Sequence, residues 1–259
     1  MPDFLTLACE VAKESGRIQR SNLGKVRHIE YKGEINLLTE VDKACEKMVI
    51  ERLQGAFPDH DIMAEEGGGK RKDSDYKWII DPLDGTTNFA HGYPLFCTSI
   101  ALEHKGEIVL GVVYEPNHDE LFCAEKGGGS FLNEKRIHVS REKEIGKSLL
   151  ATGFAYDIKK TSKNNLDHFK NMLMASQAVR RDGVAAIDLC YTACGRYDGF
   201  WELNLFPWDV AAGILVITEA GGKVTDFSGK PFSVYLKEIL ASNGLIHEQM
   251  ASVLRKSDR

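Results

Sequence analysis

The chain has 259 residues, of which 33 are basic and 38 acidic, so its formal net charge is −5. This mildly acidic balance gives no electrostatic footprint for binding nucleic acid or an anionic membrane. The N-terminus lacks an apolar leader, and no apolar run is long enough to span a bilayer. We therefore expect a cytoplasmic protein, in which the six scattered cysteines stay reduced within apolar segments.

The first quarter of the chain predicts two helices that flank a polar hairpin. Residues 4–22 carry an amphipathic stripe, and residues 25–38 have the composition of a hairpin. Thr39 is expected to cap a second helix. A short strand over residues 61–64 then leads into Glu65 and Glu66, which precede three glycines.

The segment WIIDPLDGTTNF (residues 78–89) predicts a buried strand, an acidic turn and the start of a helix. We expect the strand to break at Asp81-Pro82, because proline fixes its own φ and restricts the preceding residue. Gly85 permits tight turning, and residues 86–88 are good N-cap types. Carboxylates at a strand end gather hard cations, and free amides at a helix start bind anions. The alternative for Asp-Pro or Asp-Gly alone is a solvated turn.

In the remainder of the chain, the pattern of predicted elements changes near residue 147. Before that point, closely spaced β-rich runs at 96–103, 108–114, 121–124 and 130–132 predict an antiparallel meander. After it, strands and helices alternate. We expect strands at 148–152, 178–180, 198–203, 223–227 and 239–242, and helices at 164–176, 184–195, 208–220 and 244–256. This predicts an α+β half over residues 1–146 and an α/β half over residues 147–259.

Residues 81–89 resemble the D-P-[IL]-D-G-T-x-N-[FY] signature of the inositol monophosphatase family, whose members are metal-dependent, lithium-sensitive phosphatases. The stretch 64–67 (AEEG) looks like the family's upstream metal-ligand segment. Residues 208–213 (WDVAAG), followed by 219–222 (EAGG), look like its second signature. The resemblance covers nearly the whole chain. It implies a layered α-β-α-β-α sandwich of the sugar-phosphatase type, with the active site between the halves, and a homodimer.

The resemblance also implies a set of metal ligands: Glu65, Asp81, Asp84, Asp209 and the backbone carbonyl of Leu83. Glu66 would lie next to these ligands without binding the metal itself. All donors are oxygen atoms, which favours Mg²⁺ over zinc. Two or three Mg²⁺ ions and a bound phosphate would neutralise the repulsion among four crowded carboxylates.

Roles in catalysis follow from the same resemblance. Glu65 and Asp81 would hold the ion that acidifies the attacking water, and Asp81, Asp84 and Asp209 the ion that bridges phosphate and leaving group. The amides of Gly85 and Thr86 would cradle the phosphate, so Gly85, Thr86, Asp84 and Asp209 also form the substrate site. Thr86 would orient the water through a hydroxyl bound to Asp42.

For the organic part of the substrate, Glu202 resembles a family glutamate that accepts hydrogen bonds from polyol hydroxyls, and the Ala185 amide matches a family contact to substrate. Lys32 resembles the lysine of a mobile loop at the metal site, in a loop one residue shorter than in animal enzymes. Phe206-Pro207 stands where the animal inositol enzymes have His-Cys. This departure weakens the case for a cyclitol more than the case for phosphatase chemistry.

The leading hypothesis is a Mg²⁺-dependent phosphatase that hydrolyses inositol 1-phosphate. Within the same chemistry the alternatives are fructose 1,6-bisphosphate, histidinol phosphate, 3′-phosphoadenosine nucleotides and NADP. Arg180-Arg181 would favour a bisphosphate if they approached a second phosphate, although a surface or dimer-interface position is the simpler interpretation. From a different class, a regulatory binding protein of RNA metabolism on the same scaffold stays open.

Overall fold

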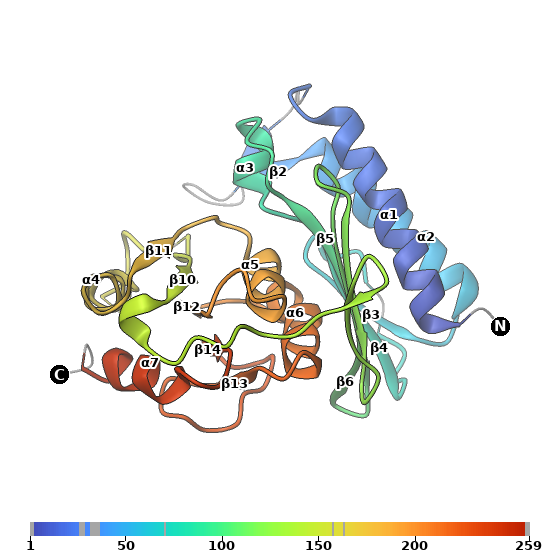
Figure 1. The fold of residues 1–259 in the computed structure, drawn as a ribbon. Coiled ribbons are helices and arrows are strands. Elements are labelled where there is room, and N and C mark those ends of the chain that lie inside the picture. The colour runs from blue at the N-terminus through green and yellow to red at the C-terminus, as the bar shows by residue number, and fades with distance from the viewer. Residues whose placement is uncertain are drawn as a thin grey trace.

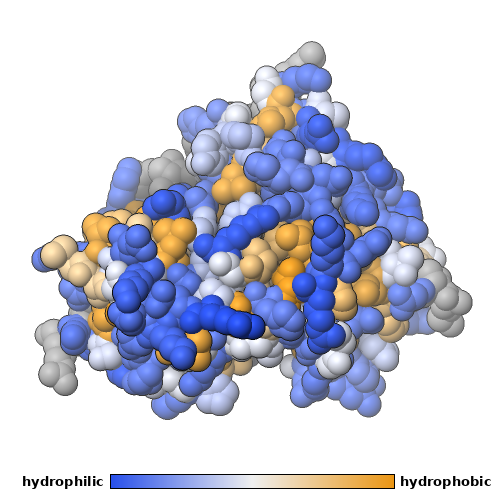
Figure 2. Space-filling view, in the orientation of Figure 1, coloured by the Kyte–Doolittle hydropathy of each residue, from blue (hydrophilic) through white to orange (hydrophobic). Residues whose placement is uncertain are grey.

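The fold alternates helix pairs and sheets in layers, and the two sheets lie on either side of a central helix pair (Figure 1). This computed structural model describes residues 3–25, 29–31, 37–69, 71–156, 158–162 and 164–256. Hydrophilic residues cover most of the face seen in Figure 2, and hydrophobic residues appear in smaller patches among them. No helix in those ranges has the length and apolar character needed to cross a membrane.

The first layer consists of α1 (Phe4–Asn22) and α2 (Glu40–Ala56), which lie side by side on the outer face of the larger sheet. Apolar side chains of both helices, Val11 and Leu53 among them, pack against strand residues such as Trp78. The helices are connected through an antiparallel pair, β1 (Ile29–Tyr31) and β2 (Leu37–Thr39). Lys32 lies outside the described residues, so its predicted place beside the metal site stays a prediction.

The larger sheet has seven strands in the order β3-β4-β5-β6-β7-β8-β9. Only β3 and β4 pair in parallel; the following strands form the antiparallel meander that the short spacing predicts. The strands are β3 (Asp61–Ala64), β4 (Tyr76–Asp84), β5 (Cys97–His104), β6 (Glu107–Glu115), β7 (Glu120–Glu125), β8 (Gly129–Leu132) and β9 (Lys135–Arg136). The short helix α3 (Thr86–Ala90) follows β4 directly.

The central layer consists of α5 (Ala185–Ala193) and α6 (Pro207–Glu219), which are apolar on nearly every side. Both are buried because they pack between the sheets: α6 lies against β5, β6 and β7, and α5 contacts α6 and strands of both sheets. Gly111 of β6 allows a close approach, since a Cβ there would come 2.6 Å from the Ala212 carbonyl oxygen. This layer joins the two halves of the chain in one core.

The smaller sheet has five strands in the order β11-β10-β12-β14-β13. Its strands are β10 (Leu149–Thr152), β11 (Ala178–Arg180), β12 (Gly199–Leu203), β13 (Lys223–Thr225) and β14 (Glu238–Ser242). β10 pairs in parallel with β11 and β12, and β14 pairs antiparallel with β12 and β13. The last layer, α4 (Leu166–Ala175) and α7 (His247–Leu254), covers its outer face.

The layered α-β-α-β-α fold that the resemblance implies is therefore confirmed, and most elements lie within two or three residues of their predicted bounds. Two short elements were not predicted: strand β9 and a 3₁₀ turn at Ile145–Lys147. All six cysteines are free thiols, as expected. The division at residue 147 stays a prediction, and α5 and α6 pack across it.

Candidate functional site

The acidic turn is part of the sheet, which corrects the predicted strand break at Asp81-Pro82. β4 continues to Asp84, and the register shifts between Asp81, which faces Ser99, and Asp84, which faces Cys97. Two residues of β4 therefore oppose a single residue of β5, which is a β-bulge. The Pro82 carbonyl inside it accepts hydrogen bonds from Gln19 Nε2 at 2.7 Å and Thr98 Oγ1 at 3.1 Å. These side chains stabilise the bulge, so proline interrupts the ladder without ending the strand.

Both carboxylates of the bulge are buried and bind backbone amides. Asp81 is 2% exposed, and its Oδ1 accepts from the Leu83 amide at 3.0 Å. Asp84 is 9% exposed, and its Oδ2 accepts from the Ala186 amide at 2.8 Å, a contact across 102 residues. Burial raises the pKa of Asp84 to about 7, although the amides of Ala186 and Gly85 oppose this rise. Asp84 thus ties the acidic turn to the first turn of α5.

Two further carboxylates lie within electrostatic reach of this pair. Glu65 follows β3, and its amide bonds the Ile80 carbonyl of the neighbouring strand at 3.2 Å. Asp209, in the first turn of α6, accepts from the Phe206 amide at 2.7 Å. The pKa of Asp81 lies well above its usual range because of burial first, and then because of Glu65, Asp84 and Asp209. The four predicted side-chain ligands therefore lie close enough to influence one another's charge.

The acidic cluster, defined as Glu65, Asp81, Asp84 and Asp209, is not a closed ligand shell. Within the described ranges, no three His, Cys, Asp or Glu side chains converge closely enough to hold a metal by themselves. Asp81, Asp84 and Asp209 each bind a different backbone amide, so separate contacts hold these three carboxylates. Burial, followed by Asp84, also raises the pKa of Asp209 well above its usual range, while the Phe206 amide and Lys237 oppose the rise.

The helix after the turn begins differently from the prediction. Gly85 is the N-cap of α3, with a left-handed φ of 94°, and Thr86 is already the first helical residue. A Cβ at Gly85 would lie 2.9 Å from Val184 Cγ2 and 3.2 Å from the Leu95 carbonyl oxygen. Glycine is required here for both its φ and its small size. The predicted N-cap role of residues 86–88 is therefore wrong.

The Thr86 hydroxyl instead contacts Asp42, as the resemblance implies. Thr86 Oγ1 lies 2.8 Å from Asp42 Oδ1 and 3.1 Å from the Leu83 carbonyl oxygen. The other oxygen of Asp42 accepts from the Thr39 amide at 2.8 Å, and Thr39 in turn caps α2, which forms a reciprocal capping box. Burial raises the pKa of Asp42, and its bonds to Thr39 and Thr86 oppose the rise. Thr86 is thereby held against the start of α2.

The predicted substrate residues come from the C-terminal part of the chain. Glu202, in β12, is 6% exposed; burial and then Asp209 raise its pKa, while Arg181 opposes the rise. A Cβ at Gly153 would lie 2.3 Å from both carboxylate oxygens of Glu202, so only glycine leaves room for this side chain. Ala185 is the first residue of α5, next to the amide that bonds Asp84. The fold thus places Glu202 and Ala185 beside the acidic cluster.

Tyr156 is a residue of this region that the sequence did not single out. It follows β10 and is 47% exposed. Burial raises its pKa to about 12, with smaller contributions from Asp84, Glu65 and Asp209. No periodicity or spacing in the sequence points to this tyrosine, because only the folded chain brings its loop over the acidic turn.

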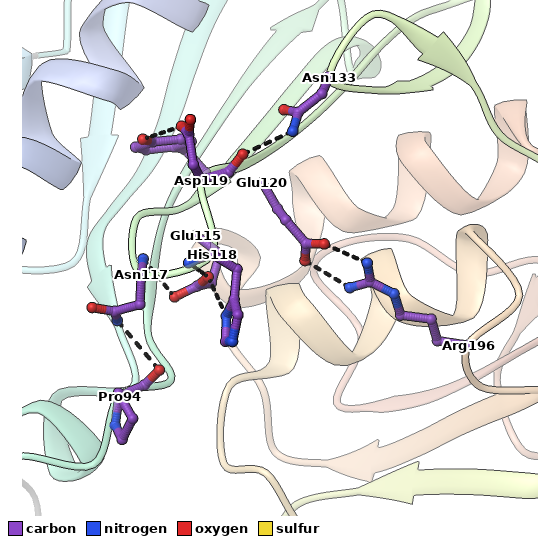
Figure 3. A network of polar contacts seen from close by, with 9 residues as sticks. Pro94, Glu115, Asn117, His118, Asp119, Glu120, Asn133 and Arg196 are labelled. Carbon is purple, nitrogen blue, oxygen red and sulfur yellow. Dashed lines mark hydrogen bonds and ion pairs between the residues drawn. The ribbon is translucent and has the colours of Figure 1, made fainter.

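The far end of α5 is attached to the larger sheet by polar contacts (Figure 3). Arg196, just after α5, forms a two-pronged ion pair with Glu120 of β7, with one N–O distance of 2.6 Å. In the adjoining turn the buried Glu115 carboxylate accepts from the amides of Asn117 at 3.0 Å and His118 at 2.7 Å. The Arg196–Glu120 pair thus links one end of α5 to β7, and the other end of α5 meets Asp84.

Comparisons with known proteins identify the family of the chain. The model of the inositol monophosphatase family matches residues 1–259. An inositol-1-monophosphatase of Synechocystis sp. is 45% identical over 253 residues, which cover 97% of this chain and 88% of that protein. A Nus factor SuhB of Pseudomonas aeruginosa is 41% identical over 252 residues, covering 94% of this chain and 92% of its own length.

A solved structure of an inositol monophosphatase from Anabaena (Nostoc) sp. shares the fold with a TM-score of 0.90 at 44% identity, covering 98% of this chain and 95% of that one. These proteins match the chain in sequence and in fold over nearly its full length, and this settles its family. The chain belongs to the inositol monophosphatase family, a family of phosphatases.

Proposed function

We propose that this chain is a Mg²⁺-dependent phosphomonoesterase whose preferred substrate is inositol 1-phosphate. The observation that carries the proposal is the acidic cluster, in which burial and mutual repulsion raise the pKa values of Asp81, Asp84 and Asp209. Such a cluster is stabilised by added positive charge. Its donors are all oxygen atoms, which fits a hard cation.

Glu65, Asp81, Asp84, Asp209 and the Leu83 carbonyl would hold two or three Mg²⁺ ions. When bound, the ions would neutralise the phosphate dianion, assist ionisation of the attacking water and stabilise the departing alkoxide. The Gly85 and Thr86 amides would orient the phosphate. No covalent intermediate with the protein is needed.

The chain's own contribution to the attack is the Thr86–Asp42 pair. Thr86 donates its hydroxyl hydrogen to Asp42 Oδ1 at 2.8 Å, so a Thr86 lone pair is left to accept a hydrogen bond from the attacking water. This contact orients the water's oxygen toward phosphorus and lowers the entropic part of the barrier. Glu65 would act beside this pair, as a ligand of the ion that binds the attacking water.

Glu202 and Ala185 would select the alcohol. The buried Glu202 carboxylate accepts hydrogen bonds from neighbouring hydroxyls of a polyol, and a substrate without them leaves a buried charge unpaired. Arg181 lies close enough to lower the pKa of Glu202, so its charge also reaches this end of the site. The hydroxyls of inositol 1-phosphate would donate hydrogen bonds to the Glu202 carboxylate. The second phosphate of a bisphosphate would instead pair with Arg181.

The test is a comparison of kcat/KM for inositol 1-phosphate, glycerol 2-phosphate, fructose 1,6-bisphosphate, histidinol phosphate, 3′-phosphoadenosine 5′-phosphate and NADP, because that ratio measures discrimination. We expect inositol 1-phosphate to lead. A preference for fructose 1,6-bisphosphate that collapses in Arg181→Ala would replace the substrate and leave the metal chemistry intact.

A regulatory role in RNA metabolism is a second candidate, because the relative that is 41% identical is named a Nus factor. An Asp209→Asn variant separates the two functions: a binding role would survive the substitution, and hydrolysis would not. Inhibition by millimolar lithium, a homodimer and a cytoplasmic location remain predictions from the family resemblance.

A further inference from the structure

Glu46 is a buried acid outside the acidic cluster, and the mechanism above does not use it. It lies on α2, one turn after Asp42, on the stripe that also carries Val49 and Leu53. The residue is only 6% exposed and lies beside apolar side chains of the first core layer. Burial of a carboxylate is unfavourable unless hydrogen bonds compensate. Its partners therefore indicate its role.

Those partners are backbone amides of the loop that follows Glu65. Glu46 Oε2 accepts from the Glu66 amide at 2.8 Å, and Oε1 accepts from the Gly68 amide at 3.0 Å. Each carboxylate oxygen thus receives one amide, and charge-assisted bonds of this kind are stronger than those between neutral groups. The first of these amides belongs to the peptide bond that joins Glu65 to Glu66.

The loop needs such an anchor because it continues with three glycines. Gly67 has a left-handed φ of 82°. A Cβ at Gly68 would lie 2.6 Å from Glu46 Oε1, and one at Gly69 would lie 2.1 Å from the Ile62 carbonyl oxygen. The glycines allow the loop to lie this close to α2 and β3. They also lose the most conformational entropy on ordering, so the loop's position depends on its hydrogen bonds.

We propose that Glu46 is a positioning residue that fixes the Glu65 backbone for metal binding. Glu65 is then held from both directions: its own amide bonds Ile80 of β4, and the amide that follows bonds Glu46. One face of α2 stabilises both parts of the site, since Asp42 binds Thr86 and Glu46 binds the Glu65 loop. The inference rests on the proposed role of Glu65 as a ligand.

A positioning role predicts a specific defect. Without Glu46 the Glu65 carboxylate is still present but less well placed, so Mg²⁺ binds more weakly while chemistry at saturating Mg²⁺ is largely retained. Loss of an outer contact of this type lowers metal affinity by about 10-fold to 100-fold. If Glu46 had only a structural role, its loss would lower the stability of the protein. The molecules that still fold would then bind Mg²⁺ with unchanged affinity.

The experiment compares Glu46→Ala, Glu46→Gln and the matched control Glu51→Ala, an exposed glutamate of the same helix. Amide hydrogen exchange of residues 65–69 is followed without metal, and Mg²⁺ binding is measured by calorimetry and by activity against Mg²⁺ concentration. We expect faster exchange at Glu66 and Gly68 and an about tenfold weaker Mg²⁺ affinity in Glu46→Ala. Glu46→Gln should lie in between, because its amide keeps one acceptor, and Glu51→Ala should match the wild type.

Unchanged exchange at Glu66 and Gly68 together with unchanged Mg²⁺ affinity in Glu46→Ala would overturn the proposal. If Glu46→Ala does not fold, Glu46→Gln decides by the same two criteria, because it has nearly the same shape. A wild-type protein without Mg²⁺-dependent hydrolysis would contradict the proposed function instead. In that case the exchange data alone would still show whether Glu46 holds the loop.

Discussion

The two sides of the candidate site are built in different ways. On the acidic side, Asp81, Asp84 and Thr86 lie within one short segment, and the bulge of β4 and the capping box of α2 fix their positions. On the substrate side, Glu202 and Ala185 come from separate elements, and Tyr156 reaches the site from a loop after β10. On the acidic side these three residues are close in sequence, and only Glu65 and Asp209 come from other elements; the substrate side is assembled wholly by packing of the smaller sheet and α5.

This difference separates chemistry from substrate choice. The acidic side places its groups through strand register and hydrogen bonds, and side chains of α1 and β5 stabilise the bulge. The substrate side uses a strand end, a helix start and a loop, and such positions accept substitution more readily.

Asp209 provides the most severe test of this difference, because it belongs to the acidic cluster although its helix belongs to the other half. Asp209→Asn should leave the fold intact and lower kcat/KM by about 10²-fold or more, as expected when a ligand of a catalytic ion is lost. Steady-state kinetics with circular dichroism checks this. Glu66→Gln is the matched control, because the bond from the Glu66 backbone amide to Glu46 is kept in this variant. Near-normal kcat in Asp209→Asn would remove Asp209 from the ligand set.

The Thr86–Asp42 pair should produce the next largest effect. Thr86→Ala should lower kcat by about 10-fold to 100-fold with little change in Mg²⁺ affinity, because Thr86 is proposed to orient water. Asp42→Asn should resemble it, and the double variant should be little worse than either, as for residues that act as a unit. A double-mutant cycle of kcat tests this prediction; independent, multiplicative losses would argue against a shared role.

The same contrast explains how much could be predicted from sequence. The acidic turn, α1, β3 and β11 could be located because apolar periodicity and a nine-residue signature are local signals. The strand break at Pro82 was mispredicted because side chains from α1 and β5 bond its carbonyl, and no local signal reports that. Glu46 lies among charged residues of a helix, where glutamate normally faces solvent.

On the substrate side, Glu202→Gln should lower kcat/KM about tenfold more for inositol 1-phosphate than for glycerol 2-phosphate, which offers fewer hydroxyls. Gly153→Ala should have the same selectivity effect, because its Cβ would occupy the space of the Glu202 carboxylate. Both substrates are compared in parallel for each variant. An equal loss for both would show that Glu202 does not contact the alcohol.

The smallest effect is expected at the Arg196–Glu120 pair, which lies far from the chemistry but holds α5. Arg196→Gln should lower the free energy of unfolding by about 1 kcal/mol or less, since the arginine side chain is 41% exposed and solvent screens the pair. Chemical denaturation measures this change, and kcat should vary less than about twofold. A loss above about 3 kcal/mol would mean that this ion pair, and not apolar packing, holds α5 in place.

In the proposed function, the buried carboxylates on the acidic side promote hydrolysis by holding cations. Its most direct test is hydrolysis of inositol 1-phosphate by the purified wild-type protein after exhaustive chelation and then after stepwise return of Mg²⁺. We expect activity to disappear on chelation and to return fully and saturably with Mg²⁺, with no loss of fold in between. Full activity in the chelated protein would contradict hydrolysis through bound cations.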